Sequence, residues 1–439
     1  MKLLLSNCTV IPMTAEGDAP RHFTGSVGIA GNRISFASPD AEEAERFLAA
    51  YPDARRIDCR DKIVMPGLVN THCHVSMTLQ RSSADDIALM EWLNDYIWPF
   101  EARQTADDIE LGARLGVAEM LLGGVTSFVD MYWHEASVFN AVRDMGMRAL
   151  LTASTLDSNL DACERDLEAL LAKVDGCERI KAGLSPHAAY TCSEATLLRT
   201  KELCRRHGLR MTTHIAETLD ETRIIAERYG CTPVERYDRL GMLDDTVIAA
   251  HCVHVTDSDI ETLRERGVHV SHNPSSNMKI ASGIAPVERM RERGVNCTVG
   301  TDGTCSNNDL DMWEEMRGAS FLQKVSTMNP LAVPAYEILK MATVNGARAL
   351  GHAGELGIIA PGALADIIVI DTVKPHMRPI HDPVSNLVYC AKASDVETVI
   401  VDGRIVVENR IVKGVDLGAL CREVQRCADR LSGRTEGAR

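Results

Sequence analysis

The chain of 439 residues is 45% hydrophobic and 25% charged, the composition of a folded globular protein, which excludes disordered, collagen-like and coiled-coil chains. Aspartate and glutamate number 62 against 47 lysines and arginines, and the resulting formal charge of −15 argues against nucleic acids or anionic membranes as partners. No apolar run approaches the roughly 20 residues that span a bilayer, and the N-terminus lacks the apolar core of a secretory signal, so we expect a cytoplasmic protein.

Short strands are predicted near the N-terminus and again from about residue 356 onward. The first group covers residues 3–11, 26–30 and 34–37, and the second covers residues 366–371, 398–401 and 405–407, the last two flanking a hairpin turn at Asp402-Gly403. Neither group has enough apolar surface to form a stable sheet alone. We therefore expect residues 1–65 and 356–415 to pair into one composite β-sandwich domain, with a C-terminal helix and tail over residues 416–439.

Residues 66–355 alternate apolar strands with longer amphipathic segments, such as residues 107–122 and 194–207. Eight parallel strands separated by helices are typical of a (β/α)8 barrel, which uses about 250 residues. A doubly wound sheet is the competing fold, but no G-x-G-x-x-G opens a helix and no phosphate-binding P-loop occurs. The predicted barrel strands are residues 63–69, 124–130, 148–153, 180–184, 209–214, 246–251, 267–271 and 296–301.

Polar side chains follow several of these strands at their carboxyl ends, where barrel enzymes assemble their active sites. His72 and His74 end the first strand, His214 ends the fifth, and Asp302 follows the eighth. Because His72 and His74 are two residues apart on an extended chain, their side chains point the same way, and Cys73 between them points away. We therefore expect three imidazoles and one carboxylate to meet at one end of the barrel.

This set of nitrogen and oxygen ligands suits Zn²⁺, with Fe²⁺ and Mn²⁺ as alternatives. Such an ion lowers the pKa of a coordinated water to about 7 and so provides hydroxide at neutral pH. A single histidine at a strand end is usually structural, but polar groups at the ends of strands one, five, six and eight together favour a metal site. The 14 cysteines are scattered without a C-x-x-C pair and are expected to be reduced, mostly buried thiols.

These motifs resemble the amidohydrolase superfamily, and within it the adenosine-type deaminases that act on 5′-methylthioadenosine and S-adenosylhomocysteine. Related deaminases and triazine hydrolases share most of the same strings, and the resemblance extends from about residue 2 to residue 412. The matching segments are 65–74 (MPGLVNTHCH), 214–218 (HIAET), 300–303 (GTDG) with 306–308 (SNN), and 362–366 (GALAD).

The resemblance implies one metal ion held by His72, His74, His214 and Asp302, and it implies Glu217 and His251 as catalytic groups beside it. Glu217 is placed to protonate the ring nitrogen next to the attacked carbon. Asp302 would accept the proton of the attacking water, while His251 would hydrogen-bond the nucleophile. The alternatives are a solvated carboxylate for Glu217 and a histidine satisfied within the core for His251.

For the substrate, the resemblance implies contacts from Trp92, Glu101, His187 and Ser306, in addition to Glu217. An aromatic face suits a purine, and a carboxylate suits the ribose hydroxyls. The alternatives are helix core for Trp92 and a surface charge for Glu101.

The chain departs from the resemblance on the third strand. Members that bind the amino-acid tail of S-adenosylhomocysteine are expected to carry an arginine in a Thr-Arg context there, whereas this chain has Thr152-Ala153-Ser154. Arg165 is a candidate for a second basic contact, although on a helix it is more often solvated. We therefore favour substrates with an uncharged 5′ group, namely 5′-methylthioadenosine, 5′-deoxyadenosine or adenosine.

Two-metal amidohydrolases bridge their ions with a carbamylated lysine at the end of strand four. Here Lys181 begins that strand and His187 ends it, so Lys181 should lie towards the opposite face. This arrangement predicts a site for a single metal ion.

Three functions compete. The first is a metal-dependent deaminase of adenine nucleosides, with a small molecule as its only expected partner. The second is a related amidohydrolase that acts on guanine, a pterin or an s-triazine, and the third is a barrel retained for binding alone. The nucleic-acid deaminase signature, H-x-E with P-C-x-x-C, does not occur. A homo-oligomer is an expectation from the superfamily only.

Overall fold

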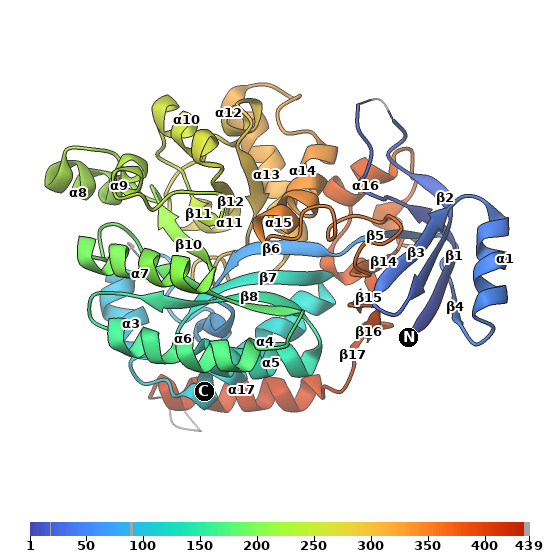
Figure 1. Cartoon of the computed structure of the whole chain (residues 1–439), viewed down its shortest axis with the longest axis horizontal. Coiled ribbons are helices and arrows are strands. Elements are labelled where there is room, and N and C mark those ends of the chain that lie inside the picture. Colours follow the sequence, from blue (N-terminus) through green and yellow to red (C-terminus); the bar gives the residue numbers. More distant parts are fainter. Residues whose placement is uncertain (18, 88–90, 434–439) are drawn as a thin grey trace.

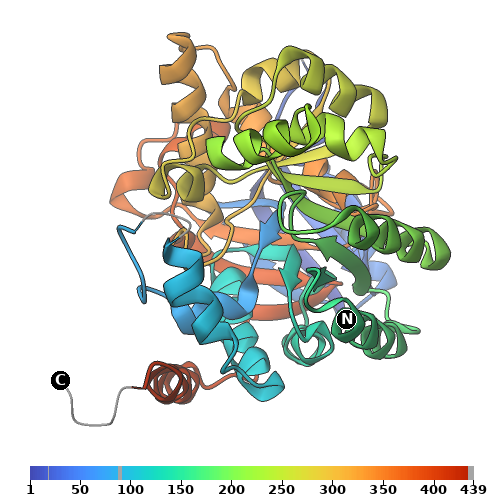
Figure 2. The ribbon, with the colours of Figure 1, turned by 90° about the vertical axis from the view of Figure 1, so that its left-hand side faces the viewer.

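The computed structural model of the protein describes residues 1–17, 19–87 and 91–433, with the side chains of residues 92 and 93 outside that description. Two sheets organise these residues (Figure 1). One consists of eight parallel strands that neighbour one another in chain order, and helices surround them (Figure 2). Its strands are β6 (Leu68–Cys73), β7 (Val125–Tyr132), β8 (Arg148–Thr155), β9 (Ile180–Pro186), β10 (Arg210–Ile215), β11 (Val247–His251), β12 (His269–His272) and β13 (Asn296–Val299).

The predicted (β/α)8 barrel is therefore confirmed. Every residue of β7 and β8 is buried, as expected for parallel strands covered on both faces. The first and last strands meet through side chains, since Thr71 Oγ1 lies 2.7 Å from Thr298 Oγ1. The covering helices are α4 (Ala106–Leu122), α5 (Glu135–Met145), α6 (Leu160–Val174), α7 (Glu194–His207), α8 (Leu219–Tyr229), α9 (Pro233–Arg239), α10 (Asp257–Arg266), α11 (Pro274–Lys279), α12 (Val287–Glu292), α13 (Met312–Thr327), α14 (Ala335–Met341) and α15 (Val344–Ala349).

Local sequence signals explain where several of these helices begin and end. Thr105, Thr232 and Thr256 each start a helix by accepting the backbone N–H three residues further on, and an acidic side chain at that position returns the bond. Gly208 and Gly230 end α7 and α8 in the left-handed conformation that favours glycine.

The second sheet joins both ends of the chain in the order β17-β16-β15-β14-β5-β1-β2-β3, with β4 beside β1. Buried residues of β1 and β2, from one end of this order, share a core with residues of β14 and β15 from the other, so the sheet folds over on itself as a composite sandwich requires. Its strands are β1 (Lys2–Val10), β2 (Phe23–Ala30), β3 (Arg33–Ser38), β4 (Arg55–Asp58), β5 (Lys62–Pro66), β14 (Ile367–Asp371), β15 (Val396–Val401), β16 (Arg404–Glu408) and β17 (Ile411–Val412).

Two features of this region differ from the sequence-based expectation. The single strand predicted over residues 63–69 is two strands, because β5 pairs with β14 in the small sheet while β6 begins the barrel. Gly67 joins them where a Cβ atom would lie 2.1 Å from Thr126 Oγ1, so the chain passes tightly from one sheet to the other. Helix α1 (Ala41–Ala50) and strand β4 are not among the predicted elements.

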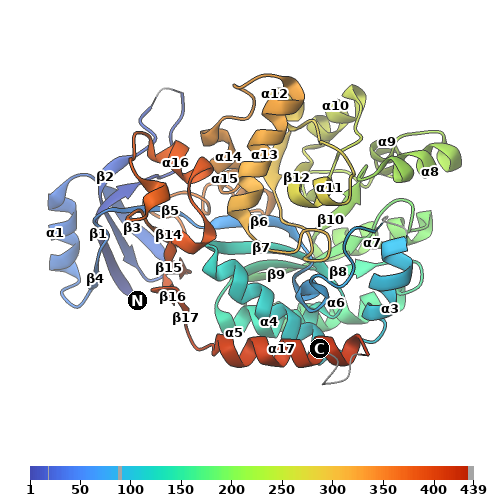
Figure 3. The same cartoon turned by 180° about the vertical axis from the view of Figure 1, so that it is seen from behind.

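The last helix of the described residues, α17 (Leu417–Leu431), returns from the small sheet to the barrel and packs against α4 and the short 3-10 helix η1 (Val75–Gln80) (Figure 3). Cys427 and Arg430 of α17 both donate to Asp108 of α4. Within the described ranges, no helix combines the length and the apolar character needed to cross a membrane.

Candidate active site

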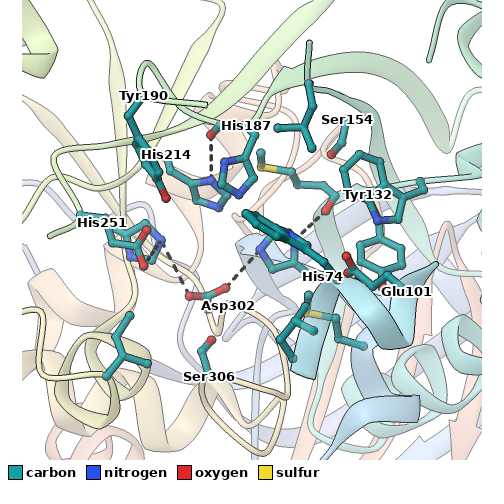
Figure 4. Close-up of a pocket in the computed structure, with 18 residues that line it drawn as sticks. His74, Glu101, Tyr132, Ser154, His187, Tyr190, His214, His251, Asp302 and Ser306 are labelled. Carbon is teal, nitrogen blue, oxygen red and sulfur yellow. Dashed lines mark hydrogen bonds and ion pairs between the residues drawn. The ribbon is translucent and has the colours of Figure 1, made fainter. Parts of the chain in front are cut away.

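A cavity of about 750 Å³, counting its open mouth, lies at the carboxyl ends of the barrel strands (Figure 4). His74, His214, His251 and Asp302 line its polar part. Its apolar wall includes Trp98 from the segment between β6 and α4, and Trp133 and Leu156 from the ends of β7 and β8. This segment contains a π-helical turn (Trp92–Ile97) and the short helix α3 (Trp98–Glu101).

The imidazoles of His72, His74 and His214 converge, with one nitrogen of each within 4.8 Å of the others. Asp302 Oδ1 lies 3.3 Å from His74 Nε2 and 3.6 Å from His72 Nε2. Both ring nitrogens of His72 are buried without a hydrogen-bond partner among the described residues. Such orphaned nitrogens are costly unless something binds them, so this donor set fits a metal ion.

Backbone carbonyls orient two of the imidazoles. His74 Nδ1 donates to the carbonyl oxygen of Met131 at 2.5 Å, and His214 Nδ1 donates to that of His187 at 2.8 Å. These bonds turn Nε2 of each ring towards the cluster, which is how metal-binding histidines are generally held.

The protonation states of two of the three imidazoles suit a cation site. Burial lowers the pKa of His72 to about 4, and burial together with neighbouring imidazoles lowers the pKa of His214 well below its ordinary value. For His74, burial opposes the charged form, but hydrogen bonding to Asp302 outweighs it and raises the pKa to about 9. Two of the three imidazoles are therefore neutral at pH 7, as metal ligands must be.

Asp302 presents its two carboxylate oxygens to different neighbours. Oδ1 accepts the Gly303 N–H at 2.7 Å and faces the paired imidazoles, whereas Oδ2 accepts the Ser276 hydroxyl at 2.6 Å and lies 3.8 Å from His251 Nε2. Its backbone φ of +64° lies in the left-handed region, which is strained for a residue other than glycine. The imidazoles keep its pKa well below the ordinary range in spite of burial.

Glu217, which follows β10, also lies close to His251. Its Oε1 lies 3.8 Å from His251 Nε2, and burial raises its pKa. The turn that carries it is held by Glu221, which accepts the N–H of Ala216 at 3.1 Å and that of Glu217 at 2.8 Å. A carboxyl group able to carry a proton thus faces an ionised carboxylate across one imidazole.

Comparison with known proteins identifies the family. The chain matches the Amidohydrolase family over residues 63–406. It is 47% identical to a 5′-deoxyadenosine deaminase of Methanosarcina mazei, with 98% of this chain and 99% of that protein aligned. It is 45% identical to a 5-methylthioadenosine/S-adenosylhomocysteine deaminase of Desulforamulus reducens, over 86% and 88% of the two chains.

The chain belongs to the amidohydrolase family.

A solved structure of an adenosine deaminase from Xanthomonas campestris with bound zinc superposes on this amidohydrolase with a TM-score of 0.94 and 33% identity, covering 98% of both chains. Atrazine chlorohydrolase from Arthrobacter aurescens shares the fold at 23% identity, with a TM-score of 0.87 and 97% of this chain and 100% of that chain covered. Amidohydrolases of this family depend on metal, and the His/Asp cluster is suited to hold it.

The amidohydrolase cavity brings most of the predicted substrate residues together. Glu101, His187 and Ser306 line it beside Glu217. Tyr132 donates to Glu101 Oε1 at 2.8 Å, and burial, partly offset by this bond, raises the pKa of Glu101 to about 7. Trp92 cannot be placed, because its side chain lies outside the described residues.

Arg165 does not take part in the cavity. It is exposed on α6, which covers the outside of the barrel, and it does not line the site. The third-strand segment where related chains are expected to carry an arginine holds Thr152-Ala153-Ser154; of these, Ser154 lines the cavity, is buried, and its Oγ lies 3.0 Å from Ser185 Oγ.

Lys181 and Cys73 both lie away from the cluster. Lys181 is exposed at the start of β9, where its ammonium donates to the carbonyl of Cys177. Cys73 turns its thiol towards Asp130 of β7.

Several lining residues are absent from the sequence-based prediction. Tyr132 and Trp133 line the cavity at the end of β7, and Ser276 and Asn277, which follow β12, do not line it but bond Asp302 and His251, so the rule that revealed the other strand-end residues also applies to these four. Their residue types, unlike a His-x-His pair, carry no specific chemical signal. Trp98 follows no strand and had no such signal at all.

Proposed function

We propose that this amidohydrolase is a deaminase that converts an adenine nucleoside to the corresponding inosine analogue and ammonia. The observation that carries the proposal is the arrangement around His251. Its Nε2 lies 3.8 Å from Glu217 Oε1 and 3.8 Å from Asp302 Oδ2, so a proton donor and a proton acceptor flank one point of the cavity. Hydrolytic deamination needs this pair, because one proton leaves water while another is added to the ring.

His72, His74, His214 and Asp302 would hold the ion, which acts as a Lewis acid that activates water at neutral pH. Glu217, whose pKa is raised by burial, carries the proton that it donates to the ring nitrogen beside the attacked carbon. Asp302 Oδ2 accepts one proton of the attacking water and returns it to the departing amino group, while the other proton of that water replaces the one that Glu217 donated as the C=O bond forms. His251 hydrogen-bonds the incoming oxygen. The C–N bond breaks, ammonia leaves, and one water is consumed.

The proposed ion is a single Zn²⁺, with Fe²⁺ and Mn²⁺ as alternatives. The three imidazoles and one carboxylate support this choice, and the similar adenosine deaminase was solved with zinc. Lys181 supports one ion over two, because its exposed ammonium lies at the far end of β9 from the cluster.

All 14 cysteines are unpaired, in keeping with the expected cytoplasmic location.

The proposed substrates are nucleosides with an uncharged 5′ group: 5′-deoxyadenosine, 5′-methylthioadenosine or adenosine. The names of the relatives support an adenine nucleoside. Trp98 and Trp133 offer aromatic surface for a purine ring, and the Glu101 carboxylate is suited to accept hydrogen bonds from the ribose hydroxyls. The third-strand segment Thr152-Ala153-Ser154 offers no cation of the kind that the carboxylate of S-adenosylhomocysteine would need.

We also propose that the catalytic domain spans residues 66–355, that residues 1–65 and 356–415 form the second domain, and that residues 416–439 form an appended helix and tail. The passage between sheets at Gly67 and the shared core of the chain ends support these boundaries.

Ammonia release from a panel of compounds tests the function. We expect turnover of 5′-deoxyadenosine, 5′-methylthioadenosine and adenosine, with a lower kcat/KM for S-adenosylhomocysteine. Guanine, a pterin and an s-triazine complete the panel. If one of these three compounds released ammonia and no adenine nucleoside did, the proposed substrate class would be wrong.

A further inference from the structure

Helix α11 contacts two side chains of the proposed reaction centre, Asp302 and His251. The hydroxyl of Ser276 donates to Asp302 Oδ2 at 2.6 Å, and the side-chain oxygen of Asn277 accepts from His251 Nδ1 at 2.9 Å. Ser276 and Asn277 are consecutive and fully buried. Two neighbouring side chains of one short helix thus hold two different reacting groups.

The hydroxyl of Ser276 determines which way the Asp302 carboxylate faces. Oδ1 is held by the Gly303 N–H at 2.7 Å and faces His74 Nε2 at 3.3 Å. With Oδ2 also held, turning the carboxylate plane away from this orientation would break two buried hydrogen bonds to a charged acceptor. The carboxylate plane is therefore held with one oxygen towards the imidazoles and the other towards His251.

A buried carboxylate anchors α11 to the strand end that carries Asp302. Glu315 of α13 accepts the backbone N–H of Ser275 at 3.1 Å through one oxygen and the Asn307 amide at 2.7 Å through the other. The same Asn307 amide donates at 2.8 Å to the carbonyl of Thr301, the residue before Asp302. The hydroxyl of Ser276 is therefore kept at a constant position relative to Asp302.

We propose that Ser276 is a positioning residue for the reaction, acting through Asp302 by keeping Oδ1 towards the histidine cluster and Oδ2 towards His251. This inference rests on the proposed function for its kinetic consequence, but its geometric part concerns only the ligand set. Loss of the hydroxyl frees the carboxylate to rotate, which weakens the cation site and misplaces the oxygen that accepts the proton.

The experiment compares Ser276→Ala, Ser276→Thr and Ser275→Ala with the unaltered enzyme. For each protein, the Kd of Zn²⁺ is measured by competition with a chromophoric chelator, and kcat and KM are measured with 5′-deoxyadenosine. Removal of a group that orients a ligand typically costs 10- to 100-fold in metal affinity or activity. We expect Ser276→Ala to weaken Zn²⁺ binding and lower kcat by about this factor, with KM nearly unchanged.

The other two variants separate positioning from general damage. Ser276→Thr keeps a hydroxyl and should recover most of the Zn²⁺ affinity and kcat. Ser275→Ala makes the same change one residue earlier, where the hydroxyl bonds neither Asp302 nor His251, and should match the unaltered enzyme. Thermal unfolding of the metal-free proteins reports whether each variant folds.

Two results would overturn the proposal. One is a Ser276→Ala protein whose Zn²⁺ affinity and kcat lie within twofold of the unaltered enzyme. The other is a folded Ser276→Thr protein as impaired as Ser276→Ala, since the hydroxyl would then not be responsible. The Zn²⁺ titration requires no substrate, so it tests the positioning of Asp302 even if no adenine nucleoside is deaminated.

Discussion

The backbone N–H of Asp302 donates to the carbonyl oxygen of His72 at 2.9 Å, which joins the last barrel strand to the first. At the same place the two side chains approach to 3.6 Å, from Asp302 Oδ1 to His72 Nε2. Closure of the barrel and assembly of the metal site are therefore one structural event, because neither approach exists until β13 lies beside β6.

Removal of the metal should destabilise the protein. A ligand that binds only the native state stabilises it by about 2.7 kcal/mol at 100 times its Kd. We expect chelator-treated protein to unfold at a lower temperature than protein supplied with Zn²⁺. His74→Ala should lose this response, whereas His207→Ala, on the exposed end of α7, should retain it. An equal Zn²⁺-dependent shift in Tm for His74→Ala would contradict the assigned ligand set.

Replacement of Glu217 by glutamine should abolish proton donation while keeping the shape of the side chain. General acid catalysis is typically worth 10²- to 10⁴-fold, so we expect kcat to fall by about that amount. Zn²⁺ binding and Tm should change little. Glu227→Gln alters an exposed glutamate of α8 and should leave kcat unchanged. If Glu217→Gln kept more than a tenth of kcat, another group would have to supply the proton.

The pH dependence of kcat/KM should show an inflection near pH 7 that belongs to Glu101. Burial raises the pKa of this carboxyl to about 7, so it is charged above that pH and neutral below it. Only the charged carboxylate of Glu101 accepts strong hydrogen bonds from the ribose hydroxyls. We therefore expect kcat/KM to fall as the pH drops through 7. Glu101→Gln should lower kcat/KM at pH 8 by roughly 10-fold or more and remove this inflection. An unchanged pH profile in Glu101→Gln would assign the inflection to another group.

The buried ion pair between Arg148 and Asp366 should stabilise the junction of the barrel and the small sheet. Arg148 Nε donates to Asp366 Oδ2 at 2.9 Å, and the two side chains are 2% and 0% exposed. Asp366→Ala would leave the buried Arg148 guanidinium with Asp402, 3.6 Å away, as its remaining carboxylate among the described residues, and removing one partner of a buried ion pair costs about 3–5 kcal/mol. We expect Asp366→Ala to lose stability by this amount in urea unfolding.

Glu261→Gln provides the comparison for that ion pair, because it removes an exposed partner of Arg264 and should leave the urea midpoint unaltered. A similar midpoint for Asp366→Ala and Glu261→Gln would show that the buried pair adds nothing to stability.

The sequence alone predicted most of the barrel, because its evidence is local and repeated. The helix predicted over residues 194–207 coincides with α7, whose start at Ser193 and end at Gly208 carry ordinary capping residues. The strand predicted over residues 63–69 was wrong as a single element, since apolar residues suit either sheet and only the pairing of β5 with β14 divides them. Helix α1 was missed although Asp40 caps its start. Because Phe47 is its only buried residue, the helix shows little of the apolar periodicity that would predict it.

In the candidate site, too, some residues were predictable from the sequence and others were not. The His-x-His spacing and the order of strand ends in the sequence determined which residues should gather, since parallel barrel strands all deliver their carboxyl ends to one face. Only the tertiary structure decided that Arg165 points to solvent, that Trp98 enters the cavity and that Ser276 bonds Asp302. Those outcomes depend on how loops and helices pack against strands that are far apart in the chain. The local pattern of apolar and polar residues does not predict such long-range contacts.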